Sequence, residues 1–455
     1  MRLSNHWKIV LPLAALALVP GYAAVQAAAE TDTYKELDAL MDVFERVRVI
    51  YVDKVDDKTL IRGAINGMLA SLDPHSSYLD GRDYANLKQT TDGEYTGLGL
   101  TVTSEDGAVK VITPTDDTPA ARAGIKAGDY ITHLDDELIY GGSLNEAVDK
   151  MRGTAGTKIK LTVVRQGEAK PLEFTLTREV VVIRPVKWET RGTVGVIRIS
   201  TFNNRTGDAT RAAVDGIKAK LGSSVAGYVV DLRSNPGGLL DEAIKVSDVF
   251  LEGGEVVSER RRAKNDVDHY YAKPGDATDG KPVLVLVDEG SASAAEIVAG
   301  ALQDHRRALV LGQRSFGKGS VQTVYPLSAD TALRLTTARY FTPSGRSVQE
   351  NGIDPDIQVP QLSDPRVSDR KPLREADLKK HLINEIKDAT DKLVEQDGSP
   401  DPRFVAKADD LKAKGVLDYQ LDYALRLIGR VAPPPLAPVQ VAGAAPAVTG
   451  RPVSR

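Results

Sequence analysis

Hydrophobic residues near the start of the chain follow two periodic patterns. Apolar side chains recur at three- and four-residue steps from Leu37 to Tyr51 and again from Leu60 to Leu69, which predicts two amphipathic helices. The pair Asp73-Pro74 ends the second pattern, because proline cannot continue a helix. We therefore expect a helical region over 30–91, with apolar stripes that contact a core or another subunit.

The pattern changes to short alternating runs between about 92 and 180. Glycines separate apolar segments that predict strands at 109–113, 159–165 and 172–178, and a helical stretch covers 144–152. This pattern of short apolar runs separated by glycines predicts a small β-rich domain.

Strand and helix patterns then alternate over 181–365. Gly227–Leu232 and Val283–Val287 are apolar strand patterns, and each is followed by a helical segment. This alternation predicts an α/β core, although β–β connections near 316–341 argue against a purely parallel sheet. The charged segment 366–430 predicts helices at 378–393, 404–414 and 419–428, and the Pro- and Ala-rich residues 431–455 predict disorder. The expected fold class is a mixed α/β multidomain protein.

The first 29 residues have the layout of a secretory signal peptide. Arg2 and Lys8 precede an apolar stretch from Ile9 to Val19, and small residues crowd Ala23 to Ala29. An uncleaved membrane anchor is the alternative, although Pro12 and other polar or helix-breaking residues weaken it. We expect an exported, periplasmic or otherwise extracytoplasmic protein.

The composition limits which catalytic groups and which binding partners are available to the chain. The chain has 455 residues, room for about three domains, and its net charge of −4 gives no support to nucleic-acid binding. Cysteine is absent, which removes thiol nucleophiles, disulfides and thiolate metal sites. None of the six histidines stands at H-x-x-x-H spacing. We therefore expect neither a metal nor another cofactor.

Three segments could supply catalytic groups. In 290–296, Ser291 and Ser293 lie between an apolar strand and a helix, where a serine is exposed beside free amides or simply caps the helix. Residues 312–318 match the start of a P-loop, but Gly319 replaces its Ser/Thr and a strand pattern follows, which disfavours nucleotide binding. Residues 231–238 end in Asn-Pro-Gly-Gly, a tight turn with free amides.

The β-rich segment resembles a bacterial PDZ domain over nearly its full length. Its most recognisable run is Ala-Ala-Arg-Ala-Gly-Ile-Lys-Ala-Gly-Asp-Tyr-Ile, at 120–131. The resemblance implies a carboxylate-binding loop whose backbone N–H groups hold a peptide C-terminus, while the adjoining strand pairs with the peptide. The residues of this loop are Gly97, Leu98, Gly99 and Leu100.

The three candidate segments occur in the order D-L-R-x-N-P-G-G, S-A-S-A-x-E and F-G-K-G-x-V-Q. In this order they resemble the carboxyl-terminal processing, or tail-specific, serine peptidases with a PDZ domain. The runs 335–347 and 352–356, and 72–78 before the PDZ-like segment, add to the likeness, which covers roughly 35–365. The resemblance implies an α/β serine peptidase core with an inserted PDZ domain and helical N- and C-terminal segments.

The resemblance also implies the role of each site residue. Ser293, not Ser291, would be the nucleophile, Lys318 its general base, and Gln322 would orient the lysine. The amide of Ala294, together with that of Gly237 or Gly238, would form the oxyanion hole. It further suggests protein substrates with exposed apolar C-termini, assembly through terminal helices and an activating adaptor.

A serine–lysine pair agrees with the scarcity of histidine. The lysine must be neutral to accept a proton, and lowering its pKa from about 10.4 toward 7–8 requires roughly 3–5 kcal/mol from burial or a nearby positive charge. His305 is a poor alternative base, because twelve helical residues after Ser293 correspond to about 18 Å of rise. A catalytically inactive PDZ scaffold on a peptidase-like core is the contrasting hypothesis.

Overall fold

A computed structural model describes residues 18–263, 265–364, 373–385, 404 and 406–431. The chain divides into two compact units, Met1–Leu72 and Asp73–Arg455. Most of the predicted signal segment and the predicted disordered tail lie outside the described residues.

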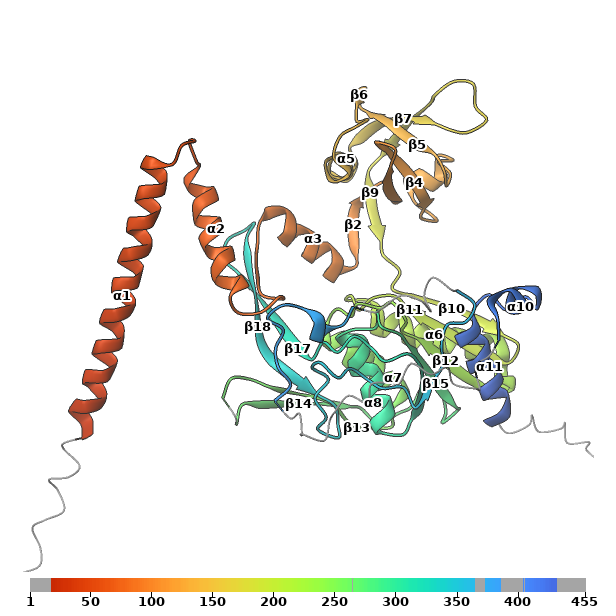
Figure 1. Ribbon diagram of the computed structural model, residues 1–455. Helices are drawn as coiled ribbons and strands as arrows, with labels where there is room; N and C mark the ends of the chain where they lie inside the picture. The colour runs from red at the N-terminus through yellow and green to blue at the C-terminus, as the bar shows by residue number, and fades with distance from the viewer. Residues whose placement is uncertain (1–17, 264, 365–372, 386–403, 405, 432–455) are drawn as a thin grey trace, which may run out of the picture. The chain divides into compact units, whose positions relative to one another are not determined.

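Two helices, α1 (Leu18–Ile50) and α2 (Asp57–Ala70), form the described part of the first unit (Figure 1). Asp56 caps α2, accepting a hydrogen bond from the Thr59 amide at 3.1 Å. Both helices confirm the periodic patterns. The apolar stripe of α1 is exposed in the chain, with Leu37 50% and Met41 55% accessible. Among the described residues, no helix is long and apolar enough to cross a membrane.

A six-stranded antiparallel sheet forms the β-rich domain. Its order is β3-β4-β5-β7-β8, with β6 paired to β5, and α5 (Leu144–Met151) and the short α4 (Pro119–Arg122) pack with it around one apolar core. β3 is an edge strand of this sheet. The strands are β3 (Leu100–Glu105), β4 (Ala108–Pro114), β5 (Tyr130–Leu134), β6 (Glu137–Leu138), β7 (Lys158–Val164) and β8 (Leu172–Thr177).

Two antiparallel strands join this domain to the rest of the second unit. β2 (Glu94–Gly97) leads into the domain and pairs with β9 (Glu179–Val182), which leads out of it. Helix α3 (Gly81–Asp92) precedes β2, and Asp80 caps its first turn. The domain is therefore inserted in the chain through a paired stem.

The α/β core is built on a second six-stranded sheet of order β10-β11-β12-β15-β16-β19, parallel except for the β10–β11 pair. Helices α6 (Thr206–Leu221), α7 (Leu240–Phe250) and α8 (Ala294–Asp304) cover one face, and α11 (Tyr419–Val431) and α10 (Ala408–Ala413) pack on the other. The strands are β10 (Val186–Arg191), β11 (Val194–Ile199), β12 (Gly227–Asp231), β15 (Val283–Val287), β16 (Ala308–Gly312) and β19 (Ile357–Gln358).

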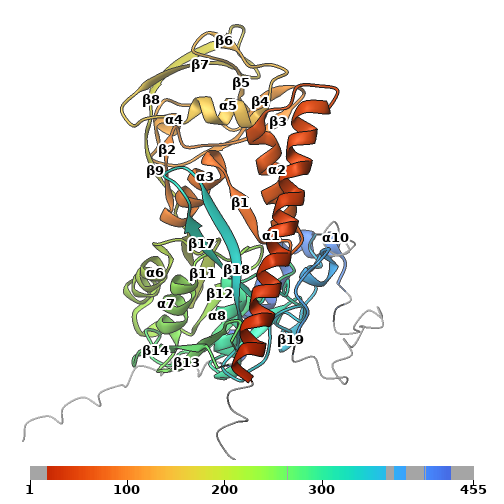
Figure 2. The ribbon, with the colours of Figure 1, turned by 90° about the vertical axis from the view of Figure 1, so that its left-hand side faces the viewer.

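A third sheet, of order β1-β18-β13-β14, adds the antiparallel element expected near 316–341. β17 pairs with β18 in a long hairpin (Figure 2). The first residues of β18 also pair with β1, which brings the segment that follows Asp73-Pro74 next to this sheet. The strands are β1 (Ser77–Leu79), β13 (Gly254–Arg260), β14 (Val267–Ala272), β17 (Ser320–Pro326) and β18 (Ala332–Phe341).

The fold class is confirmed, but the C-terminal prediction was wrong in part. Residues 378–385 are turns and coil rather than a helix, and only the 3₁₀ turn Glu375–Asp377 precedes them. This segment is held by side chains of the core, so its charged helical pattern does not decide its conformation. The remainder of the predicted helix 378–393 lies outside the described residues. α10 is shorter than predicted, whereas α11 is confirmed.

Candidate active site

Ser293 lies where the buried strand β15 gives way to helix α8, of which it is the N-cap. Its backbone has φ 55° and ψ −115°, a conformation that L-residues rarely adopt and that persists only when its surroundings enforce it. The Ser293 amide donates to Glu296 Oε2 at 2.8 Å, which holds the turn. The side chain is half-buried and projects from the helix N-terminus.

Ser291 has a different role. It is fully buried, and its hydroxyl donates to the Leu232 carbonyl oxygen while accepting from the Asp288 amide, both at 2.9 Å. A hydroxyl committed to two main-chain partners fixes the loop and cannot easily act as a nucleophile. The two serines therefore differ in their surroundings: Ser291 is held inside the loop, whereas Ser293 lies at the N-terminus of α8.

Glu296 joins the serine turn to the lysine loop. Its carboxylate accepts hydrogen bonds from the amides of Ser293 (2.8 Å), Gly317 (2.7 Å) and Lys318 (3.0 Å), and from the Ser315 hydroxyl. Burial raises the pKa of Glu296 to about 7, although these hydrogen bonds oppose the shift. Sequence reasoning assigned Glu296 no role; its signal was its place three residues after Ser293.

Lys318 follows β16 in a loop and is followed by β17, so the P-loop reading fails as expected. Burial of its ammonium lowers the pKa of Lys318, with Glu375 opposing and Arg334 assisting the shift. Tyr340 on β18 donates to the Lys318 carbonyl oxygen. Burial raises the pKa of Tyr340 well above its ordinary value, against a hydrogen bond with Ser293, so it remains a neutral phenol beside both residues.

Gln322 lies on β17, and its amide nitrogen donates to the Ser320 hydroxyl at 3.0 Å and the Thr336 hydroxyl at 3.3 Å. A hydrogen bond between Gln322 and Lys318 is not among those found in the described part of the chain. Thr336 in turn donates to Asp73, which is buried. Burial favours the protonated form of Asp73, but hydrogen bonds from Ser76, His75 and Thr336 hold its pKa below the ordinary value.

The Asn-Pro-Gly-Gly turn lies directly against Ser293. A Cβ added to Gly237 would come within 2.8 Å of Ser293 Cβ and 2.9 Å of the Ala294 amide nitrogen, so only glycine fits. The Gly237 amide donates to Asn235 Oδ1 at 2.8 Å. Among the hydrogen bonds of the described residues, none uses the amides of Gly238 or Ala294.

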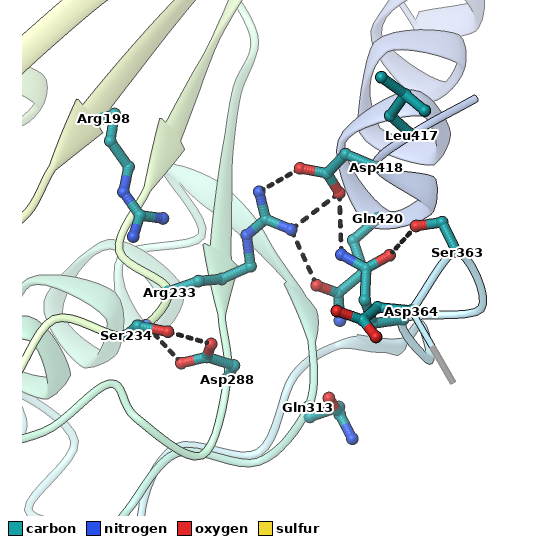
Figure 3. A pocket seen from close by; sticks show the side chains of 11 residues that line it. Arg198, Arg233, Ser234, Asp288, Gln313, Ser363, Asp364, Leu417, Asp418 and Gln420 are labelled. Atoms are coloured by element: carbon teal, nitrogen blue, oxygen red, sulfur yellow. Dashed lines mark hydrogen bonds and ion pairs between the residues drawn. The ribbon is translucent and has the colours of Figure 1, made fainter. Parts of the chain in front are cut away.

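A polar pocket of about 280 Å³ is lined by residues that follow β12, β15 and β16 in the chain, among them Arg233, Asp288 and Gln313 (Figure 3). Its central guanidinium, Arg233, is 10% exposed and pairs with Asp231 and Asp418, at 2.8 and 2.7 Å. The pocket also includes Ser234 and Asp288, which precede Gly237 and Ser293 in the chain. Neither Ser293 nor Lys318 borders it, so we interpret its ion pairs as support for the turns that carry Gly237 and Ser293.

His305, the alternative base, lies at the C-terminal end of α8. His305 follows the last residue of α8, and its Nε2 donates to the Glu255 carbonyl oxygen at 2.7 Å, so it is a capping residue. Within the part of the chain that the structure describes, no group of three or more His, Asp or Glu side chains could hold a metal ion.

The loop 97–100 joins the stem strand β2 to the first strand of the six-stranded antiparallel sheet. Gly97 ends β2, Leu98 is 3% exposed in the domain core, and Leu100 begins the edge strand β3. Gly99 has φ +78°, and a Cβ there would lie 2.3 Å from Thr118, so glycine is required. The loop therefore offers backbone groups rather than side chains beside an unpaired strand edge.

Comparison with known proteins agrees with this arrangement. Residues 193–359 match Peptidase family S41, residues 96–176 match the PDZ domain, and residues 20–82 match the Activating protease CtpB N-terminal domain. The Carboxy-terminal-processing protease of Bartonella bacilliformis is 54% identical over 333 residues, which cover 73% of this chain and 77% of the relative. The chain belongs to peptidase family S41. It is a carboxy-terminal processing serine peptidase that contains a PDZ domain.

A second relative and a solved structure share less sequence with this S41 peptidase. Carboxy-terminal processing protease CtpB of Bacillus subtilis is 34% identical over 351 residues, 75% of this chain and 72% of the relative. Among solved structures, the photosystem II D1 C-terminal processing protease is 32% identical, with a TM-score of 0.44 over 71% of this chain and 88% of its own.

Proposed function

We propose that this peptidase is an exported endopeptidase that captures proteins by their C-terminal tails and cleaves them with a Ser293–Lys318 dyad. The observation that supports it most is the Glu296 bridge, because one buried carboxylate holds the main chain of both residues. The lowered pKa of Lys318 favours the neutral amine that a general base needs.

The proposed reaction proceeds through an acyl-enzyme. Lys318 takes the proton of the Ser293 hydroxyl, whose oxygen attacks the peptide carbonyl carbon, and the developing oxyanion accepts from backbone amides. The protonated lysine then gives its proton to the leaving amine. Water, deprotonated by the neutral lysine, hydrolyses the ester and restores the serine. Because Asn235 occupies the Gly237 amide, Gly238 with Ala294 is the better oxyanion pair.

Substrate capture is assigned to the PDZ domain. The loop 97–100 would hold the terminal carboxylate, and the free edge of β3 would pair with the adjoining residues of the tail. Leu100 and Val102 on β3, with Leu144 and Val148 on α5, are partly buried apolar side chains that pack against the core of this domain. They favour apolar residues at the substrate C-terminus.

Proteolysis of a matched pair of reporters by the purified full chain tests both parts. One reporter ends in apolar residues with a free carboxylate, and the other has the same sequence with an amidated C-terminus, which removes the terminal charge. We expect cleavage of the free form at least tenfold faster at subsaturating concentration. Ser293→Ala and Lys318→Ala should each abolish it. Cleavage by both variants would refute the dyad, and binding without cleavage by the wild type would favour a scaffold.

Export and assembly are further parts of the proposal. The basic and apolar start of the sequence supports export, and N-terminal sequencing of protein from an extracytoplasmic fraction tests it, since an intact Met1 would contradict cleavage. The exposed apolar stripe of α1 supports a homo-oligomer, which light scattering would detect. Loss of the oligomer on Leu40→Glu with Met41→Glu would support that surface.

A further inference from the structure

A histidine–carboxylate pair lies beside the loop that carries Lys318, and it includes neither residue of the proposed dyad. Glu375, in the short 3₁₀ turn of the C-terminal segment, is fully buried. His75, from the segment before β1, places its Nε2 at 2.9 Å from both Glu375 carboxylate oxygens. The two residues are 300 positions apart in the chain, yet they meet at the lysine loop.

Glu375 is attached to both ends of that loop. Its amide donates to the Phe316 carbonyl oxygen at 3.2 Å, two residues before Lys318. Gln349 donates to Glu375 Oε1 at 3.1 Å and accepts from the Gly319 amide at 2.9 Å, one residue after Lys318. The carboxylate is therefore held at a fixed position beside Lys318.

Four charged groups influence the pKa of Lys318. Glu375 comes from the C-terminal segment, Arg334 from β18, Glu296 from α8 and Asp73 from the loop before β1. Arg334 also donates to the His75 carbonyl oxygen at 3.1 Å, so His75 lies between Glu375 and this cation. Glu375 exerts the strongest charge effect on the pKa of Lys318, and its sign opposes that of burial.

We propose that Glu375 is a positioning residue for the reaction, which acts through Lys318 by holding a buried negative charge beside its ammonium. The lysine therefore becomes a base at a higher pH than burial alone would set. Arg334 acts in the opposite direction. The C-terminal segment 373–385 thus contributes a charge to the catalytic centre, although it lies outside the residues 193–359 that match the peptidase family. The inference rests on the proposed dyad.

The test measures inactivation of Ser293 by a small fluorophosphonate, as a function of pH, in the full chain. This reagent needs neither a peptide tail nor the PDZ domain, and its rate rises with the neutral fraction of Lys318. Glu375→Gln keeps groups that hydrogen-bond Gln349 and His75 but removes the charge. We expect the acid limb of the pH–rate profile of this variant to move down by roughly half to one pH unit. On that limb the variant should react about three- to tenfold faster than the wild type.

Two further variants separate charge from structure. Arg334→Gln removes a positive charge and should move the acid limb upward by a similar amount. Glu350→Gln is the matched control, since Glu350 is 9% exposed, accepts from His381 at 2.8 Å and lies against the same loop through Gly317. It disrupts a similar buried pair, but Glu350 is not among the charges with the largest effects on the pKa of Lys318, so the acid limb should stay in place.

The outcomes distinguish this inference from the function on which it rests. Shifts of opposite sign for Glu375→Gln and Arg334→Gln support it, because damage to the fold cannot speed the reaction at low pH. Unshifted limbs, or a shift shared with Glu350→Gln, overturn it while the dyad stands. Undiminished inactivation of Lys318→Ala would overturn the dyad itself, and this inference with it.

Discussion

Replacing Gly237 by alanine tests the turn that places the oxyanion amides. The added Cβ would meet the Ala292 carbonyl oxygen at 2.7 Å and Ser293 Cβ at 2.8 Å, and the backbone φ is +94°. A positive φ costs an L-residue roughly 1–2 kcal/mol, and a forced contact in a packed site adds about 1–3 kcal/mol. We expect the free energy of unfolding to fall by about 2–5 kcal/mol.

Activity should fall further than stability explains. The contact can be relieved only by moving the turn away from Ser293 and Ala294, which displaces the amide that would bind the oxyanion. Loss of one such donor lowers kcat by about 10²–10³-fold. Urea unfolding gives the folded fraction, and hydrolysis of the free-tail reporter gives kcat for that fraction.

Gly192→Ala is the matched control. Gly192 also has a positive φ, +59°, but a Cβ there would find no atom within 4 Å. We expect a loss of about 1–2 kcal/mol in stability from the backbone alone and an unchanged kcat. If Gly237→Ala keeps a kcat within threefold of the control, our reading of the turn is incorrect.

Three further changes probe the buried charges. Because the pKa of Glu296 is raised to about 7, its contribution to stability is present below pH 4.5 and disappears as the pH rises through 7. Urea unfolding should therefore show that the wild type loses up to about 3 kcal/mol relative to Glu296→Gln between pH 4.5 and 8. Parallel stability curves for the two proteins would contradict this prediction. Burial raises the pKa of Asp418, but the ion pair with Arg233 outweighs it and lowers the pKa to about 2; the side chain is about one-third exposed. In the same assay, Asp418→Asn should reduce the free energy of unfolding by about 1–2 kcal/mol at pH 7 and by less below pH 3. An equal reduction at both pH values would refute the ion-pair explanation. Arg165→Met leaves the Asp129 carboxylate, which is 1% exposed, without its ion pair, and should destabilise the PDZ domain by about 3–5 kcal/mol. Thermal unfolding should show this as a lower melting temperature for the domain. Adding Asp129→Asn should restore part of the lost stability.

Much of this fold could be predicted because it is encoded locally. The strands β12 and β15 are buried on both faces and therefore appear as continuous apolar runs, and the stripes of α1 and α2 follow helical periodicity. Ser293 and Lys318 could be named because family motifs mark them. Helix α6 was not predicted, since the first half of its buried face is small and polar, with Thr206, Gly207 and Thr210, and only its second half is apolar.

The residues that sequence reasoning missed act through contacts between distant segments. Glu296 was visible in its motif, but its role depends on the amides of Gly317 and Lys318, which only the folded chain brings to it. Glu375 lies in a charged segment whose pattern predicts a helix further on, and nothing local marks it as buried. Its burial follows from His75 and Gln349, which no periodicity connects to it.

The Glu296 bridge has a practical consequence for finding natural substrates. Glu296 accepts hydrogen bonds from the main-chain amides of Ser293 and Lys318, so removing either side chain leaves these hydrogen bonds in place. Ser293→Ala should therefore fold like the wild type and keep its PDZ domain able to hold tails that it cannot cut. Such a variant is a trap, and proteins that it retains through a free apolar C-terminus, and releases to an excess of tail peptide, are direct candidates for what this peptidase processes.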